Sequence, residues 1–451
     1  MTKWSAIALG LGISLTACGG TASKSTPSSP SPDPPPPANI TVVNHIIYML
    51  QENESFDRYF GQLNAYRQSL GLGADVDVTP SNASQLGYDG STIITPFHML
   101  SMCTDIVSPG WSHSHFDWNL KAPISGTPLM NGFAYSAGSI SAYNRAISDK
   151  NGKRVMGYYD QQDFPYYYFL ATQFAMSDRW FSPVMTNTPA NRMYAMAATS
   201  QGVTGLTNTA PNGISATTIF DELQKAGVTW KDYVPDYPQG SSLVPFPTYS
   251  HFQSNIVPLS DYFSDLKNGN LPQVAFIDDD AKNDLDEHPG PGVSVQAGSA
   301  FVASIIDALM SSSSWKDSVF FLSYDEAGGF YDHVPPVATV SPDGIPPILL
   351  PYDVCSHSTG PNCNFVFTGF RVPNIVVSPF SKAHYVDHTP IDHTAILAFI
   401  EKRFGLPALT KRDAAQPDIS FFFDFGGAPN MTPPTPPSQP TNGPCYVNTL
   451  P

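Results

Sequence analysis

The chain has 451 residues, of which 41% are hydrophobic and only 13% charged, a composition that predicts a globular domain and excludes a disordered or coiled-coil protein. Acidic residues outnumber basic ones by 38 to 22, which gives a formal net charge of −16 at pH 7. Because such a charge repels a phosphate backbone, we do not expect nucleic acid as a partner.

The N-terminus has the pattern of an export signal. Lys3 precedes the apolar stretch 6–15, which is too short to span a bilayer. Residues 15–18 then read Leu-Thr-Ala-Cys, which resembles a bacterial lipobox, whose cysteine is lipidated after cleavage. We therefore predict an exported lipoprotein anchored to a membrane in the bacterial periplasm or at the cell surface. The alternative is a plain secretory signal with a bystander cysteine.

These features divide the chain into three parts. Residues 1–17 are predicted to be the signal peptide. Residues 18–38 comprise the lipidated Cys18 and a linker rich in proline and serine, which cannot pack into a core. Residues 39–451 are predicted to form a single folded domain with a C-terminal tail.

Four further cysteines remain for an oxidising compartment. Cys355 and Cys363 flank a short polar loop and are the natural pair, which leaves Cys103 to pair with Cys445. Free thiols or metal binding are the alternatives, although no Cys-x-x-Cys spacing occurs.

Apolar runs alternate with helical patterns along the folded part. Strands are predicted over 40–50, 228–230, 274–277, 318–324 and 372–377. Helices are predicted over 218–226, 294–309 and 389–404, and a glycine follows the first and the last of them. This alternation predicts an α/β fold with a mostly parallel central sheet covered by helices on both faces.

Acidic and amide side chains follow two of the predicted strands. Glu52 and Asn53 come after the first strand, and Asp325 and Glu326 directly follow the strand over 318–324. Ligands of open α/β sheets bind outside the carboxyl ends of the strands, and hard oxygen donors suit a divalent cation. The alternative is that these residues are solvated loop or helix-cap positions.

Six segments of the chain carry distinctive motifs: HIIYMLQENESFDRYFG at 45–61, WSHSHFDWN at 111–119, the segment 156–192 ending in TPANR, DEHP at 286–289, YDEAGGFYDHVPP at 324–336 and the segment 371–413. Together they resemble a bacterial phosphoesterase family that contains phospholipases C and an acid phosphatase branch. The resemblance covers nearly the whole chain after the linker. It implies an alkaline-phosphatase-like α/β/α sandwich and hydrolysis of a phosphate ester.

The resemblance also implies a hydroxyl nucleophile and metal ligands. Aligning Asn191-Arg192 with the family places the nucleophile at Thr188, where metal coordination would lower the pKa of the hydroxyl. This sequence has alanine where the family usually has proline before the asparagine, and Ser182 and Thr186 lie close by. A capping role for Thr188 is the other interpretation. The metal ligands implied are Glu52, Asn53, Asp325 and Glu326, for a divalent metal ion whose identity stays open.

Three histidines fall inside the matched segments. His115, His288 and His333 are predicted to bind a phosphoryl oxygen or to protonate the leaving group, with structural roles as the alternative. Asn191 is predicted to donate to the phosphate, whereas Arg192 would either do the same or pair with a core carboxylate.

The sequence thus predicts a phosphoric ester hydrolase whose substrate class is open. A phospholipase C-like phosphodiesterase acting on phospholipid and a broad-specificity acid phosphatase acting on monoesters are both compatible with it. A lipoprotein that binds a phosphorylated ligand without turnover is a third hypothesis. Carboxylesterase, P-loop and zinc-protease motifs are missing, which counts against those classes.

Overall fold

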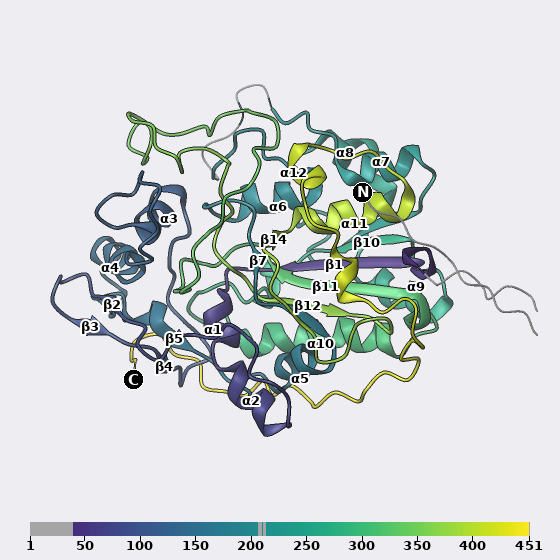
Figure 1. Cartoon of the computed structure of the whole chain (residues 1–451), viewed down its shortest axis with the longest axis horizontal. Coiled ribbons are helices and arrows are strands. Elements are labelled where there is room, and N and C mark those ends of the chain that lie inside the picture. The colour runs from purple at the N-terminus through teal and green to yellow at the C-terminus, as the bar shows by residue number, and fades with distance from the viewer. Residues whose placement is uncertain (1–38, 206–209, 211–212, 451) are drawn as a thin grey trace, which may run out of the picture. The chain divides into compact units, whose positions relative to one another are not determined.

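A computed structural model describes residues 39–205, 210 and 213–450 (Figure 1). Ala38–Pro451 forms one compact unit. The predicted signal peptide, Cys18 and the linker lie outside the described residues. Among the helices that are described, none combines the length and the apolar character needed to cross a bilayer.

The centre of the compact unit is an eight-stranded sheet of order β13-β6-β12-β11-β1-β10-β8-β9. All neighbours pair in parallel except β12, which is antiparallel to both β11 and β6. The strands are β1 (His45–Gln51), β6 (Ala175–Ser177), β8 (Trp230–Val234), β9 (Ile256–Pro258), β10 (Val274–Ile277), β11 (Ser318–Tyr324), β12 (Asn374–Val377) and β13 (Val386–Asp387).

Helices cover both faces of this sheet, as Figure 1 shows. One layer contains α1 (Phe56–Phe60), α2 (Leu63–Ser69), α5 (Pro165–Gln173) and α10 (Val295–Met310), and α9 (Ser260–Asn268) packs on α10. The other contains α6 (Thr188–Ala197), α7 (Ile219–Lys225), α8 (Pro247–His251), α11 (Thr394–Phe404) and α12 (Lys411–Ala414). The predicted α/β/α sandwich with a mostly parallel sheet is therefore confirmed.

Small elements lie beyond one end of the sheet. They are β2 (Gln85–Leu86), β3 (Ile93–Ile94), β4 (Phe97–His98), β5 (Gly157–Tyr158), α3 (Trp111–Trp118) and α4 (Phe133–Tyr143). A further two-stranded pair, β7 (Trp180–Phe181) with β14 (Ile391–Asp392), lies outside the main sheet.

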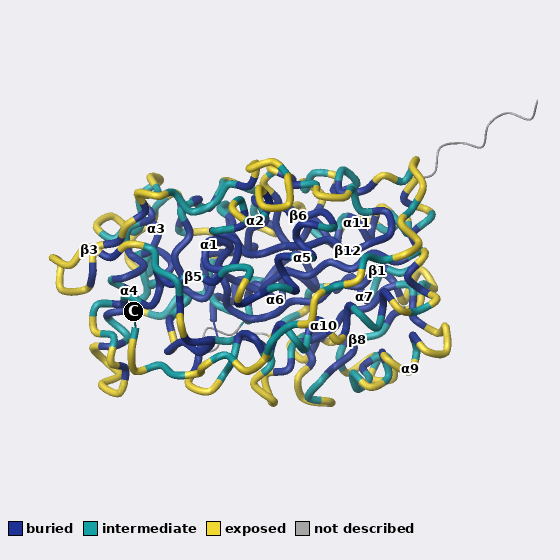
Figure 2. The backbone as a smooth tube through the Cα atoms, turned by 90° about the horizontal axis from the view of Figure 1, so that it is seen from below, coloured by how far each residue is buried: buried dark blue, intermediate teal, exposed yellow. Residues whose placement is uncertain are grey.

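The core runs through the middle of the sheet. Every residue from Ile46 to Leu50 has no exposed surface, and β11 is buried along its whole length. Figure 2 shows a dark, buried interior with exposed loops around it. Burial on both faces explains why these strands are unbroken apolar runs rather than alternating patterns.

Several predicted elements begin later than expected, and the strand predicted over 228–230 is β8, which covers Trp230–Val234. The first strand starts at His45, because residues 40–42 form a 3-10 helix capped by the Asn39 side chain. The strand predicted over 372–377 starts at Asn374 and is antiparallel. The last helix starts at Thr394, since Ile391 and Asp392 pair with β7 instead. The first shift results from the local Asn39 cap, whereas the other two involve strands distant in sequence, which a local pattern does not reveal.

Both predicted disulfides are present. Cys355 and Cys363 close the short loop, with their Cα atoms 5.6 Å apart. Cys103 and Cys445 join across 342 residues, with a Cα–Cα distance of 4.9 Å, so the C-terminal tail is tied to the body.

Candidate active site

The candidate active site lies at the carboxyl ends of β1 and β11. These strands are parallel neighbours with Gln51 opposite Tyr324, so the residues that follow them lie side by side. The backbone N–H of Asn53 donates to Asp325 Oδ1 at 3.0 Å, and the N–H of Glu326 donates to the same oxygen at 2.7 Å. The four predicted metal-ligand residues therefore form one group, and all are buried.

Thr188 enters this group from the first turn of α6. Its Oγ1 donates to Glu52 Oε2 at 3.0 Å and lies 3.4 Å from Asn53 Oδ1. Asn187, not Thr188, occupies the N-cap position, so the capping interpretation is wrong. The nearby hydroxyls face elsewhere: Ser182 donates to the Phe370 carbonyl and Thr186 to the Thr204 carbonyl. Of these three hydroxyls, Thr188 is the one that faces the carboxylates.

The side chain amide of Asn53 can face this group in either of two orientations. Its Oδ1 faces two other acceptors, Glu52 Oε2 at 3.2 Å and Glu326 Oε1. Turning the amide would let its NH2 group donate to both carboxylates and its oxygen accept from His288 Nε2 at 3.0 Å. Oxygens of Glu52 and Glu326 and the amide group of Asn53 thus lie close together beside Thr188. That donor set fits a hard divalent cation, which prefers carboxylate and amide oxygens.

The surrounding charge supports the same conclusion. Arg192 lies within 4 Å of four carboxylates. Its guanidinium is 3.0 Å from Glu52, 3.2 Å from Asp279, 3.6 Å from Asp325 and 3.8 Å from Asp278. One guanidinium cannot neutralise four acids, and Glu326 adds a fifth nearby. Arg192 therefore has the second of its two predicted roles, as a partner of core carboxylates.

The excess of acid changes the protonation of these groups. Burial, reinforced by the Asp325 carboxylate, raises the pKa of Glu52 to about 7. Burial likewise raises the pKa of Asp325 to about 6 and that of Asp279 to about 7. Such shifts are the response of like charges held together in a dry site, and a bound cation would offset them.

His288 is the one predicted histidine that the structure brings to this group. Its ring Nε2 lies beside the Asn53 amide, and its Nδ1 is 3.0 Å from the Pro289 carbonyl oxygen. Its backbone N–H donates to Asp286 Oδ1 at 3.2 Å. The half-buried imidazole is thus held at the edge of the group.

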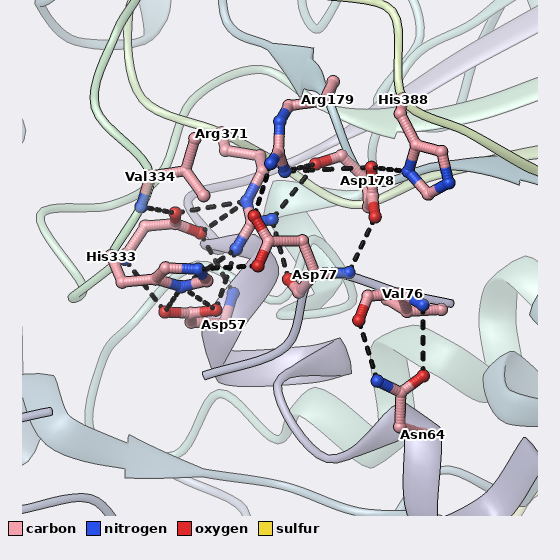
Figure 3. Close-up of polar contacts among 11 residues, drawn as sticks. Asp57, Asn64, Val76, Asp77, Asp178, Arg179, His333, Val334, Arg371 and His388 are labelled. Carbon is pink, nitrogen blue, oxygen red and sulfur yellow. Dashed lines mark hydrogen bonds and ion pairs between the residues drawn. The ribbon is translucent and has the colours of Figure 1, made fainter. Parts of the chain in front are cut away.

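His333 lies in a different cluster (Figure 3). Its Nδ1 is 2.8 Å from Asp57 Oδ2 and its Nε2 is 3.1 Å from Asp77 Oδ1. Burial lowers the pKa of His333, but the bonded Asp57 carboxylate outweighs burial and raises it. Both ring nitrogens are engaged by carboxylates, and within the described residues no contact joins the ring to Thr188. This placement does not support the predicted contact with substrate.

Arg371 is the centre of the His333 cluster. Its Nη2 donates to Asp57 Oδ1 at 2.8 Å, and its Nε donates to Asp332 at 3.1 Å. Asp57, Asp332 and His333 offer ligand atoms within 4.8 Å of one another, but the guanidinium already occupies the space between the two carboxylates.

His115 and Asn191 are buried and bonded to backbone. His115 Nδ1 is 2.7 Å from the Trp111 carbonyl and Nε2 is 3.0 Å from the Asn362 carbonyl, and desolvation lowers its pKa. The Asn191 amide donates to the Thr186 carbonyl at 2.8 Å and accepts from the Val184 N–H at 2.9 Å. These placements correct both predictions of direct contact. Asn191 instead fixes the chain that leads into Thr188.

Sequence reasoning missed the acids that follow β10. Asp278 and Asp279 extend from this strand, which is parallel to β1, and pair with Arg192. The same strand-end rule that indicated Glu52 and Asp325 applies to them, so the signal was present in the run Asp278-Asp279-Asp280.

Comparison with known proteins identifies the class. Residues 43–407 match the Phosphoesterase family, so the chain belongs to this family and is a hydrolase of phosphoric ester bonds. It is 29% identical over 467 residues to phospholipase C B of Mycobacterium tuberculosis, covering 92% of this chain and 82% of the relative. It is 29% identical over 412 residues to non-specific phospholipase C1 of Arabidopsis thaliana, covering 86% and 72%.

Two solved structures are also similar to this chain. A protein of the alkaline phosphatase superfamily from Vibrio parahaemolyticus has a TM-score of 0.34 at 14% identity, over 56% of this chain and 64% of that one. Murine ectonucleotide pyrophosphatase/phosphodiesterase 5 has a TM-score of 0.32 at 10% identity, over 54% and 90%.

Proposed function

We propose that this protein is a phospholipase C-like phosphodiesterase with Thr188 as its nucleophile. The carrying observation is the 3.0 Å hydrogen bond from Thr188 Oγ1 to Glu52 Oε2, inside a group of acids with excess negative charge. A divalent metal ion held by Glu52, Asn53, Asp325 and Glu326 would supply that missing positive charge. The relatives named phospholipase C support a phosphodiester of a phospholipid as the substrate.

Different residues of this chain carry out different steps of the reaction. Thr188 Oγ1 forms a bond to phosphorus as the bond from phosphorus to the leaving oxygen breaks, and the hydroxyl proton passes to Glu52 Oε2, which accepts its hydrogen bond. The N-terminus of the ten-residue helix α6 faces the attacked phosphoryl group and stabilises its charge. His288 protonates the leaving oxygen, and water then hydrolyses the phosphothreonine ester. A bound cation would lower the pKa of the nucleophile and offset charge on the phosphoryl oxygens.

We also propose that the protein works at a membrane surface after export. The Leu-Thr-Ala-Cys run that ends at Cys18 and the proline-rich residues 25–37 support a lipidated N-terminus on a spacer. Such an anchor would hold the enzyme close to phospholipid. Mass spectrometry of the membrane fraction tests this part, since an unmodified Cys18 in the mature protein would contradict it.

The test of the function measures phosphocholine released from phosphatidylcholine and phosphate released from nitrophenyl phosphate. Thr188→Val keeps the shape of the side chain but removes the hydroxyl, whereas Thr188→Ser keeps a hydroxyl. We expect phosphocholine release by the wild-type protein, its loss in Thr188→Val and after chelation, and partial retention in Thr188→Ser. Phosphate release alone would assign the protein to the acid phosphatase branch. Full activity of Thr188→Val would exclude Thr188 as the nucleophile.

A further inference from the structure

Glu287 is a buried carboxylate between two residues of the site, Asp286 and His288. It has no exposed surface, and its backbone adopts a left-handed conformation with φ of 68°. This conformation is uncommon outside glycine and persists only where the surroundings enforce it. Strained positions of this kind cluster at functional sites, so the forces that hold Glu287 are informative.

Four donors from four elements hold its carboxylate. Oε2 accepts from the hydroxyl of Tyr59 on α1 at 2.5 Å and from that of Tyr324 on β11 at 2.8 Å. Oε1 accepts from Tyr167 on α5 at 2.5 Å and from Gln51 at the end of β1 at 3.3 Å. No ion pair with a basic side chain is formed by Glu287 among the described residues. The carboxylate is therefore held by neutral hydrogen bonds.

The fit around Glu287 is also tight in space. A methyl group added to Gly298, in the first turns of α10, would lie 2.2 Å from Glu287 Cγ and 2.9 Å from the Leu285 carbonyl oxygen. Only a glycine lets this helix approach the segment so closely. Two independent features, the hydrogen bonds and the helix contact, thus define one position for the segment 285–288.

This position delivers two groups to the candidate active site. The Asp286 carbonyl accepts from the Glu52 N–H at 3.0 Å, so it fixes the backbone of a proposed metal ligand. The His288 ring reaches the Asn53 side chain, and Asp286 Oδ1 accepts the His288 N–H. Glu287 lies between these two contacts, and its own side chain points away from the site into the tyrosines.

We propose that Glu287 is a positioning residue, whose carboxylate, bound by Tyr59, Tyr167 and Tyr324, holds Asp286 and His288 against Glu52 and Asn53. The effect of this positioning on catalysis rests on the proposed function. Because a positioning residue acts through groups that work in the transition state, its loss lowers kcat more than it raises KM.

Glu287→Gln tests this in the full-length protein. Gln keeps the size of the side chain but presents an NH2 group to donors. We expect kcat for the phosphate ester to fall by about tenfold or more, with KM within about twofold of wild type. Exchange of the backbone amide hydrogens of residues 284–290 with solvent should become faster.

The matched control is Asp307→Asn on α10, whose carboxylate accepts from the Tyr166 hydroxyl at 2.8 Å. In this control, kcat and exchange over 284–290 should stay unchanged.

The outcomes separate this proposal from the proposed function. If kcat per folded molecule of Glu287→Gln stays within about twofold of wild type, the positioning role is overturned. If Glu287→Gln does not fold, Tyr167→Phe removes one donor at constant shape, and unchanged kcat and exchange in that variant would overturn the proposal. If the wild-type protein hydrolyses neither ester, the proposed function fails. Exchange over 284–290 in the variants then decides by itself whether Glu287 holds the segment.

Discussion

Two clusters of carboxylates surround an arginine in this protein, and they differ in charge balance. Around Arg371, the acids Asp57, Asp77, Asp178 and Asp332 are accompanied by a second guanidinium, that of Arg179, and by the His333 imidazole (Figure 3). Around Arg192, four acids share a single guanidinium.

The comparison shows why similar residues have different roles. A balanced cluster is complete and holds distant segments together, whereas an unbalanced one has negative charge left for a cation or for a reaction. Both clusters contain residues from the matched motifs, so a motif residue is not by itself a residue of the site.

The largest effect on activity is expected when an acid is removed from the Arg192 cluster, which has an excess of negative charge. Glu326→Gln removes one proposed metal ligand from the unbalanced cluster, and kcat/KM should fall by about 10³-fold, as for the loss of metal-assisted charge stabilisation. The melting temperature of the chelator-treated variant should not fall, because burial and the neighbouring Asp325 raise the pKa of Glu326 and disfavour its charge. If Glu326→Gln were less stable but fully active, the Arg192 cluster would have a structural role, and the difference drawn between the two clusters would be contradicted.

The same type of change in the balanced cluster should have the opposite result. Asp57→Asn leaves Arg371 and His333 short of a partner, and we expect a loss of about 3 kcal/mol in the free energy of unfolding. Urea denaturation measures it, and kcat of the folded protein should change little. Asp75→Asn is the control, since Asp75 pairs with Arg67 but its side chain is 49% exposed. The control should lose less than about 1 kcal/mol.

Histidine variants sharpen the comparison further. His288→Gln should lower kcat by about 10²-fold, because it removes the proposed general acid. His115→Gln should lower the melting temperature and leave kcat of the folded protein nearly unchanged, since both ring nitrogens face backbone carbonyls. Equal losses of kcat in the two variants would contradict the separation of roles drawn here.

The smallest effect concerns pH in the chelator-treated protein. Glu52 and Asp279 have pKa values of about 7 in the folded protein, raised first by burial, whereas an unfolded chain has ordinary values near 4. Between these values the folded state binds more protons than the unfolded state, so stability falls as pH rises. From pH 5 to pH 7 the expected loss in the free energy of unfolding is about 2 kcal/mol for each of the two groups, measured by urea denaturation, and Mn²⁺ should reduce it. A flat profile with chelator would contradict the unbalanced charge.

Much of the fold and part of the site follow from local sequence. The apolar runs at β1, β10 and β11 predict these strands without further information, since a strand buried on both faces needs no polar alternation. Parallel neighbours end at one edge of a sheet, so Glu52 and Asp325 meet as predicted. The resemblance placed Thr188, and the folded chain brings it to Glu52 across 136 residues.

Only the tertiary structure decided which polar residues face the site. His115, His333 and Asn191 lie in matched motifs, yet His115 and His333 face partners distant in sequence, and Asn191 is bonded to the backbone just before α6. The reason is that a side chain's role depends on the charges and carbonyls packed against it, and for the two histidines these include groups from distant segments. Residue types and their spacing therefore determined the sheet and the strand-end acids, whereas folding alone determined where charge is balanced and where it is left over.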